Sequence, residues 1–390
     1  MYKKALSSLS ILYFMMGFIT CLNDILVPFL KKTFHLGYSE ASLVQVSFFA
    51  AYGLTSIPSS RLIEKIGYHK GIIVGFIMMA VGCLLFIPAT MLSEYHWFLC
   101  ALFVIASGIV MLQVAANPFV AQIGAPETAS SRLSLVQAFV SLGTFIAPFY
   151  GAVLILGNSS SDISILRLPY ILIAGALIVI AVLMSQLDFP NPTASVERTS
   201  WMSVLKNKKV ILGMIGIFVY VGAEVSIGSF LVNYVISMSP MKPTEAANLV
   251  AIYWGGAMAG RFLGMFTLKE FPPGKVLVAH ALIAISLILI SINSHGMIAI
   301  YTMILVGFCN SIMFPTIFTL SIKGLESGTQ KASGLLSTSI LGGSLIPLIT
   351  GQLADKWGLR LAMCVPLLCY VYIWLFGCAN RPKALSTGKI

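Results

Sequence analysis

Two acidic side chains lie far from the ends of the apolar runs that contain them. Asp24 falls inside GFITCLNDILVPFLKK, residues 17–32, and Glu224 falls inside YVGAEVSIGSFLV. An ionised carboxylate costs roughly 2.5–3.5 kcal/mol at the centre of a membrane helix, so each acid must be protonated, hold a cation or face water. The other eleven acids fall in predicted loops or at helix ends, and no Lys or Arg is predicted at this depth. We therefore interpret both acids as functional residues without a salt-bridge partner.

Oxygen-bearing side chains accompany Asp24 in the sequence. Asn23 is its direct neighbour, and Thr20 lies one turn earlier on the same helical face. Hard oxygen donors around one carboxylate suit a small hard cation, so Asp24, Asn23 and Thr20 form a candidate cation-coupling site. For Thr20 alone, a hydrogen bond back to its own helix is an equally good interpretation.

Further polar and aromatic side chains recur one turn apart on the predicted helices. Amides and carboxylates bind polar groups of a ligand, and aromatic rings pack against its apolar faces. The candidate substrate-binding residues are Gln113, Asn117, Gln137, Glu224, Tyr253, Trp254 and Asn310. Amides also join membrane helices to one another, and that structural role is the alternative for each of them.

The elements that carry these residues are predicted to be transmembrane helices. The 390 residues are 58% hydrophobic and 9% charged, with a mean hydropathy of +0.94, which predicts a polytopic membrane protein in a lipid bilayer. A membrane helix needs about 20 mostly apolar residues. Twelve runs meet this requirement, near residues 7–30, 41–60, 70–92, 97–123, 132–156, 168–186, 210–237, 245–267, 275–293, 297–322, 332–354 and 360–378. The net charge of +11 comes from basic residues in short links between runs, so nucleic acid is not an expected partner.

The chain divides into two similar halves. The long polar interval 187–209 has the composition of a cytoplasmic linker between an N-terminal six-helix bundle, 1–186, and a C-terminal bundle, 210–390. PETASSRLSLVQAFVSLGTFIAP matches LESGTQKASGLLSTSILGGSLIP at a constant offset, which pairs Arg132 with Lys331 and Pro148 with Pro347. With both termini in the cytoplasm, 18 of the 24 basic residues lie on that side, as the positive-inside rule requires. The pattern predicts an all-α protein of two pseudo-symmetric halves, with a substrate site between them.

Several stretches of the sequence are distinctive: GFITCLNDILVPFLK, LQVAANPFVAQIG, RLSLVQAF, YWGGAMAGRFLG and GFCNSIMFPTIFTL. They resemble the fucose/galactose/glucose symporter family of the major facilitator superfamily, and its bacterial glucose/galactose transporter branch in particular. The resemblance runs along essentially the whole chain. It implies a cation-coupled importer of a hexose in a bacterial inner membrane, so the candidate substrate-binding residues become candidate sugar-binding residues, with amides and carboxylates for paired hydroxyl groups and an aromatic ring for the apolar face of the sugar. We also expect a monomer without a cofactor.

The sequence departs from the proton-coupled, fucose-transporting branch of that family at two positions. The residue before VAANPF is a Glu in that branch and is Gln113 here, and an Asn of its helix five is replaced by Val140. Because Gln113 does not titrate, while Asn23 and Thr20 offer neutral oxygens, we expect sodium at Asp24. A proton remains the alternative ion.

Charged residues in the predicted cytoplasmic loops are candidates for a gate. Glu64 and Lys65 lie in the loop SRLIEKIGYHK, and Arg132 and Lys331 begin the two repeated helices. Charge contacts among these four residues are expected to hold the outward-open state, although their basic members also act simply as topology signals.

Three other classes of protein are less consistent with the sequence. An enzyme is not predicted, because four of the five histidines lie in or beside loops and no HExxH motif, nucleophile elbow or phosphate-binding loop occurs. A receptor or channel is disfavoured by the twelve-helix repeat. Proton-coupled efflux of an apolar compound stays open as the less favoured transport function, since efflux pockets carry few amides.

Overall fold

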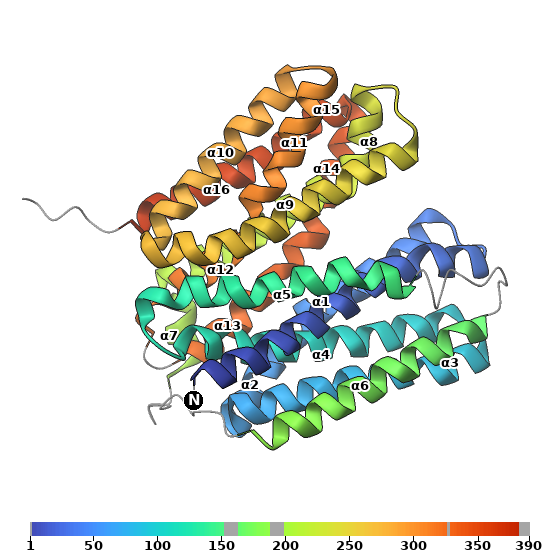
Figure 1. Cartoon of the computed structure of the whole chain (residues 1–390), viewed down its shortest axis with the longest axis vertical. Helices are drawn as coiled ribbons and strands as arrows, with labels where there is room; N and C mark the ends of the chain where they lie inside the picture. The colour runs from blue at the N-terminus through green and yellow to red at the C-terminus, as the bar shows by residue number, and fades with distance from the viewer. Residues whose placement is uncertain (1, 152–162, 188–198, 326–327, 382–390) are drawn as a thin grey trace, which may run out of the picture. The chain divides into compact units, whose positions relative to one another are not determined.

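Helices make up the computed structural model of the chain, which describes residues 2–151, 163–187, 199–325 and 328–381. No strand occurs within these ranges. Ten helical segments are long and apolar enough to cross a membrane; one of them, the 50-residue Leu43–Leu92, contains two of the predicted runs, and a shorter apolar segment, Ser8–Asn23, lies in the first helix. The described parts of all twelve predicted runs are therefore mostly helical, and the all-α polytopic membrane class is confirmed (Figure 1).

The chain forms two compact units. The first comprises Met1–Gly124, Val136–Asn207 and Gly324–Ser344, and the second comprises Ala125–Leu135, Lys208–Lys323 and Leu345–Ile390. Each unit thus includes a short segment from the opposite half of the sequence. The predicted boundaries at 186 and 210 lie on either side of the division between residues 207 and 208. The two segments from the opposite half, Ala125–Leu135 and Gly324–Ser344, belong, apart from the first residue of each, to the two stretches that match each other in the sequence.

The first unit contains the helices that carry the predicted cation residues. Its elements are α1 (Tyr2–Thr33), α2 (Tyr38–Leu84), α3 (Phe86–Leu92), α4 (Tyr95–Gln122), most of α5 (Ala129–Gly151), η3 (Ile163–Leu166), α6 (Arg167–Ser185), α7 (Trp201–Lys206), α13 (Thr329–Thr338) and η4 (Ser339–Leu341). Within this unit α2 packs against α4, α6 and α13. The predicted linker therefore contains a short helix, α7, while its residues 188–198 lie outside the described part of the chain.

The second unit contains Glu224 and most of the predicted sugar residues of the C-terminal half. Its elements are η1 (Pro126–Thr128), the start of α5, α8 (Lys208–Met238), α9 (Pro243–Glu270), α10 (Pro273–Asn293), α11 (Gly296–Asn310), α12 (Met313–Ile322), most of α14 (Gly342–Trp357), α15 (Leu359–Ala362) and α16 (Cys364–Ala379). Within it α10 packs against α11 and α16, and α9 packs against α11.

Glycines allow neighbouring helices to approach at backbone distance. A Cβ atom on Gly17 of α1 would lie 1.9 Å from the carbonyl oxygen of Val140, and one on Gly143 of α5 would lie 2.1 Å from that of Phe14. Because neither glycine can carry a side chain here, α1 and α5 are in direct backbone contact.

A strip of glycines on α9 also serves close packing. A Cβ on Gly260 would lie 2.5 Å from the hydroxyl oxygen of Ser311, and one on Gly264 would lie 2.2 Å from Ile312. Small residues at this spacing are typical of membrane helix interfaces.

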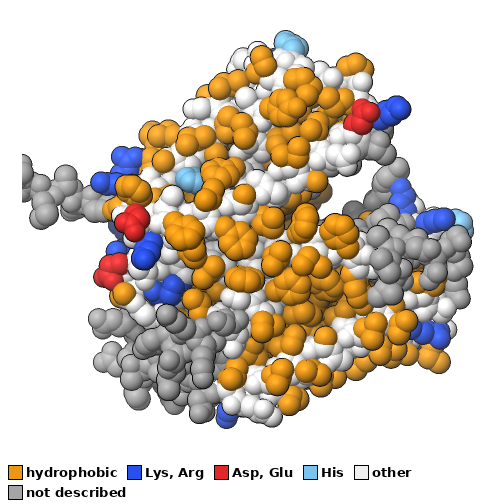
Figure 2. Space-filling model, viewed as in Figure 1, with side chains coloured by type: hydrophobic (Ala, Val, Ile, Leu, Met, Phe, Trp, Pro, Cys, Tyr) orange, Lys and Arg blue, Asp and Glu red, His pale blue; other side chains and the backbone are white. Residues whose placement is uncertain are grey.

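The surface agrees with a membrane location. Large apolar side chains such as Leu54, Ile298 and Leu368 are more than 60% exposed. Figure 2 shows hydrophobic side chains over most of the visible face, with charged side chains towards the helix ends. Exposing so many apolar side chains to water would be unfavourable, whereas lipid tails solvate them.

Candidate functional site

In the first unit, α1 and α4 are joined by a buried hydrogen bond between polar side chains. The Tyr13 hydroxyl donates to Asn117 Oδ1 at 2.6 Å, and both side chains are fully buried. Gln113 lies one turn before Asn117 on α4. Asn117 Nδ2 and Gln113 Oε1 are buried and have no hydrogen-bond partner among the described residues. The helix α4 thus carries two amide side chains with unused polar atoms, and one of them, Asn117, contacts α1.

Asn23 on α1 is also a buried amide with unpaired polar atoms. Its side chain is 3% exposed, and neither its Oδ1 nor its Nδ2 has a hydrogen-bond partner in the described part of the chain. Leaving a buried polar group unpaired costs about 1–3 kcal/mol, and native proteins keep few such groups without a reason. A ligand that supplies the missing interaction is one such reason.

The other two predicted cation residues differ in what the structure says of them. The Thr20 hydroxyl donates to the carbonyl of Met16 at 2.8 Å, which is the bond back to its own helix that was the alternative for this residue. Its oxygen still has a lone pair for a second contact. Asp24 lies in α1, but its side chain falls outside the described residues.

In the second unit, Glu224 has a basic partner, which corrects the prediction that it has none. Arg261 Nη2 lies 3.7 Å from Glu224 Oε1, and the two side chains are 15% and 12% exposed. The prediction was wrong because Arg261 was assigned to the cytoplasmic end of its helix. It lies nine residues before the end of α9 at Glu270, which is about 14 Å at 1.5 Å per residue.

A network of tyrosines and one amide surrounds this ion pair. Asn310 Nδ2 donates to the Tyr253 hydroxyl at 2.8 Å, and the Tyr253 hydroxyl lies 3.3 Å from the Glu224 carbonyl, to which it donates. The Tyr370 hydroxyl donates to Asn310 Oδ1 at 2.6 Å, and that of Tyr220 donates to the Asn310 carbonyl. All four side chains are buried, so the network joins α8, α9, α11 and α16 behind Glu224.

The network separates the roles of the predicted sugar residues in this unit. Tyr253 and Asn310 use their polar atoms on other helices, which fits residues that position Glu224. Trp254 is different, since its side chain is 42% exposed. Its indole packs over Gly228, where a Cβ atom would lie 2.7 Å from the ring. An aromatic surface of this kind is suited to the apolar face of a sugar.

Two of the four predicted gate residues form an ion pair. Lys331 Nζ on α13 lies 2.8 Å from Glu64 Oε1 on α2, within the first unit. In the second unit, Arg132 donates to the Ala125 carbonyl at 2.8 Å, at the start of its own helix. Lys65 is exposed, and Gln137 is a buried residue of α5.

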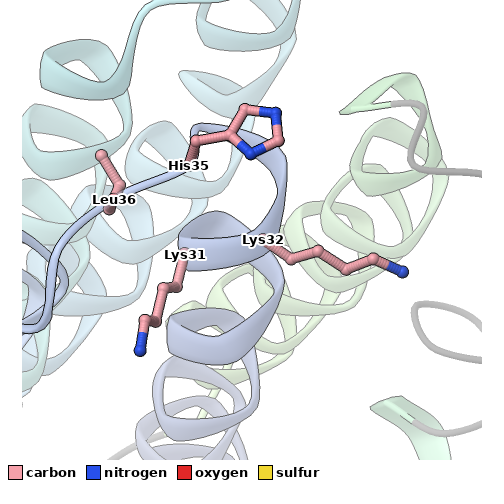
Figure 3. Close-up of a pocket in the computed structure, with 4 residues that line it drawn as sticks. All are labelled: Lys31, Lys32, His35 and Leu36. Carbon is pink, nitrogen blue, oxygen red and sulfur yellow. The ribbon is translucent and has the colours of Figure 1, made fainter.

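A surface pocket at the end of α1 is a separate feature. It is lined by Lys31, Lys32, His35 and Leu36, whose long side chains extend in different directions (Figure 3). None of the predicted site residues lines it. No group of three or more His, Cys, Asp or Glu side chains that could hold a metal ion occurs among the residues described.

Sequence reasoning missed Tyr13, Tyr370 and the role of Arg261. Tyrosines are common in membrane helices, and only the fold shows which hydroxyl reaches which amide. For Arg261 the sequence did hold a signal. Arg261 lies inside the predicted run 245–267, and multiplying its distance from the helix end by the rise per residue would have placed it away from the membrane surface.

Comparisons with known proteins agree with this architecture. The sequence profile of the Major Facilitator Superfamily matches residues 9–346. The chain is 47% identical to a glucose/galactose transporter of Brucella abortus, over 96% of this chain and 94% of the relative. It is 33% identical to the L-fucose-proton symporter of Escherichia coli, over 94% and 90% of the two chains. The crystal structure of the transporter FucP, in its outward conformation, superimposes with a TM-score of 0.91 at 31% identity, covering 98% of this chain and all of FucP.

Proposed function

Because this chain belongs to the major facilitator superfamily, and is therefore a membrane transporter and not an enzyme, we propose that it imports a hexose of the glucose/galactose class by cation-coupled symport. Relatives named glucose/galactose transporter, at 47% and 44% identity over almost the whole chain, support the choice of sugar. The same relatives are bacterial, which supports an inner-membrane location. The excess of basic residues in one set of loops favours cytoplasmic termini, and the transporter is proposed to act as a monomer.

The observation that carries the proposal is the set of unpartnered amides on α1 and α4. Asn23, Gln113 and Asn117 each keep at least one buried polar atom without a hydrogen-bond partner among the described residues. Membrane helices that only pack together do not need such groups. A sugar hydroxyl or a desolvated cation supplies the interactions that these amides lack.

The order of these amides along the helices favours two adjacent ligands. The contact between Tyr13 and Asn117 fixes where α1 and α4 meet. Consecutive spans alternate in direction, so α1 and α4 run antiparallel, and Gln113 lies near the level of Gly17. Asn23 lies ten residues beyond Tyr13, about 15 Å along α1. We assign Gln113 and Asn117 to sugar hydroxyls, and Asn23, Thr20 and Asp24 to the cation.

Sodium is the ion that we propose at Asp24. Asn23 and Thr20 offer neutral oxygens, which ligate a hard cation and do nothing for a bound proton. A proton carrier is often assisted by a second acid nearby, and position 113 holds a non-titrating amide. Sodium bound at Asp24 would neutralise its charge and increase the affinity for sugar, and sugar would increase the affinity for sodium by the same factor.

Proton coupling is the second candidate, and a specific observation favours it. The relatives at 33% and 27% identity are named L-fucose-proton symporters. In that case Asp24 is the proton carrier. The remaining residues keep the roles proposed here.

In the C-terminal half we propose that Glu224 and Trp254 contact the sugar. Glu224 Oε1 has no hydrogen-bond partner in the described part of the chain, and its charge is balanced by Arg261. Tyr253, Asn310, Tyr220 and Tyr370 hold the backbone that carries it. Gln137 is retained as a sugar residue on α5. The Glu64–Lys331 pair is proposed as the cytoplasmic gate, together with Lys65, which follows Glu64, and Arg132, which is the repeat counterpart of Lys331.

The test is uptake of radiolabelled glucose and galactose into proteoliposomes with an inward sodium gradient and no pH gradient. We expect sodium-stimulated uptake that Asp24→Asn abolishes while sugar exchange persists. Asp355→Asn is the matched control, because Asp355 is an exposed acid of α14. Uptake that ignores sodium and follows an inward pH gradient would assign the proton to Asp24. Failure to transport either sugar under both gradients would overturn the proposed substrate class.

A further inference from the structure

A second polar cluster in the first unit joins the linker helix to the predicted gate. The Lys331 ammonium lies 2.8 Å from Glu64 Oε1 and donates to the Thr199 carbonyl at 2.7 Å. It also lies 5.7 Å from the centre of the Trp201 ring, and the Arg61 guanidinium lies 5.4 Å from the same ring. One indole thus accepts two cations, both within the range of cation–π attraction.

The helix that carries Trp201 is anchored by its own sequence. Ser200 caps α7, since its side chain accepts a hydrogen bond from the Met202 amide. Val204, one turn after Ser200, is 2% exposed. At the start of α13, Gly328 has a φ of +86°, and a Cβ there would lie 2.9 Å from Val204 Cγ2 and 3.2 Å from Thr199 Cγ2. Glycine at this position therefore provides both the backbone conformation and the space that α7 occupies.

The gate itself is a contact between α13 and α2. Besides the ion pair, the Ser60 hydroxyl on α2 donates to the Gln330 carbonyl at 2.8 Å, and Gly334 packs on Ser60. Lys331 is 8% exposed, so its ammonium must keep its partners to remain buried. Two of those partners, Thr199 and Trp201, belong to the linker and not to either gate helix.

We propose that α7 is a latch of the transport cycle: Trp201 and the Thr199 carbonyl hold Lys331 on Glu64, so that α13 separates from α2 only after the linker helix has been released. Trp201 acts as a positioning residue, because it touches the charged side chains of the gate and neither sugar nor cation. The linker then takes part in setting the rate of opening on the cytoplasmic side. The inference requires that the chain is a transporter of this superfamily, but it does not depend on which sugar or ion is carried.

The experiment measures how often the contact between α2 and α13 opens. Ser60→Cys places a thiol at a fully buried position in that contact. The full-length protein in membranes is treated with the membrane-permeant reagent N-ethylmaleimide, and modification of residue 60 is followed by peptide mass spectrometry, so that native cysteines do not interfere. No substrate is added, and failure of the proposed sugar or ion assignment would leave this readout unaffected.

In this background, Trp201→Ala should raise the labelling rate about fivefold or more, as expected for the loss of two cation–π contacts. Met202→Ala is the matched control, because Met202 is the next residue of α7 and is 58% exposed; it should label at the parent rate. Lys331→Met should also raise the rate, and adding Trp201→Ala to it should cause little further change.

Gly328→Ala reaches the latch by another route. The added Cβ atom would displace Val204 and Thr199, although Trp201, Lys331 and Glu64 themselves are not substituted. Gly328→Ala should therefore also raise the labelling rate. Size-exclusion chromatography shows which variants are folded, and if Trp201→Ala is not, Gly328→Ala decides. The proposal is overturned if a folded Trp201→Ala or Gly328→Ala variant labels at the parent rate. It is likewise overturned if Trp201→Ala and Lys331→Met act independently.

Discussion

The ion pair between Arg261 and Glu224 gives the most direct test of the site in the second unit. The charged atoms are 3.7 Å apart, with side chains 15% and 12% exposed. At an effective dielectric constant of about 20, unit charges at that separation attract by about 4.5 kcal/mol. Removing one partner of a buried pair costs about 3–5 kcal/mol, mainly because the other charge is left uncompensated. Arg261→Gln should therefore destabilise the protein strongly.

The assay is the melting temperature of the purified transporter in detergent, compared over a double-mutant cycle. Arg261→Gln should melt well below the wild type, and Arg261→Gln combined with Glu224→Gln should melt above Arg261→Gln alone, because no buried charge is then unpaired. The cycle cancels the other contacts of Arg261. Lys269→Gln, an exposed cation on the same helix, is the control and should change little. A double variant whose loss equals the sum of the single losses would refute the coupling, as would an Arg261→Gln variant as stable as the control.

Three further predictions follow from particular contacts. Tyr13→Phe removes the donor to Asn117 Oδ1; it should cost about 1–3 kcal/mol of stability and raise the KM for sugar, and an unchanged KM would separate Asn117 from the sugar. Gln113→Ala and Asn117→Ala should raise the KM with sodium affinity kept, whereas the reverse pattern would assign these amides to the cation. Gly143→Ala should greatly reduce the yield of folded protein, because its Cβ would lie 2.1 Å from the Phe14 carbonyl, whereas Gly175→Ala has nothing within 4 Å and should be neutral; equal yields would contradict the backbone contact between α1 and α5.

The helical spans could be predicted from the sequence because hydrophobic length is a local property. Each apolar run long enough to cross a bilayer is mostly helical in its described part, since lipid offers backbone groups no other partner. The break inside Leu43–Leu92 was also predictable, because Gly67, with a φ of +83°, lies in the charged loop between two runs.

The pairing of polar side chains could not be predicted in the same way. The sequence indicated Asn117 and Asn310 as polar positions, but which tyrosine each one meets depends on helix rotation and register, which hydropathy does not encode. The error at Arg261 has a different cause. Arg261 lies six residues before the end of the predicted run 245–267 and was assigned to the cytoplasmic end of that run, whereas the helix α9 extends to Glu270 and places Arg261 beside Glu224.

The reciprocal glycines of α1 and α5 have a mechanical consequence. With Gly17 against Val140 and Gly143 against Phe14, each helix places Cα hydrogens on the carbonyl side of the other, the geometry of weak Cα–H···O bonds. Two backbones in such contact cannot slide past each other without a steric clash. We therefore expect α1 and the adjoining part of α5 to move as one rigid body. With the cation at Asn23 and the sugar at Gln137, as proposed above, a displacement of α1 would carry Gln137 with it. Coupling between the two proposed ligands would then need no chain of moving side chains, because both would act on one rigid pair of helices.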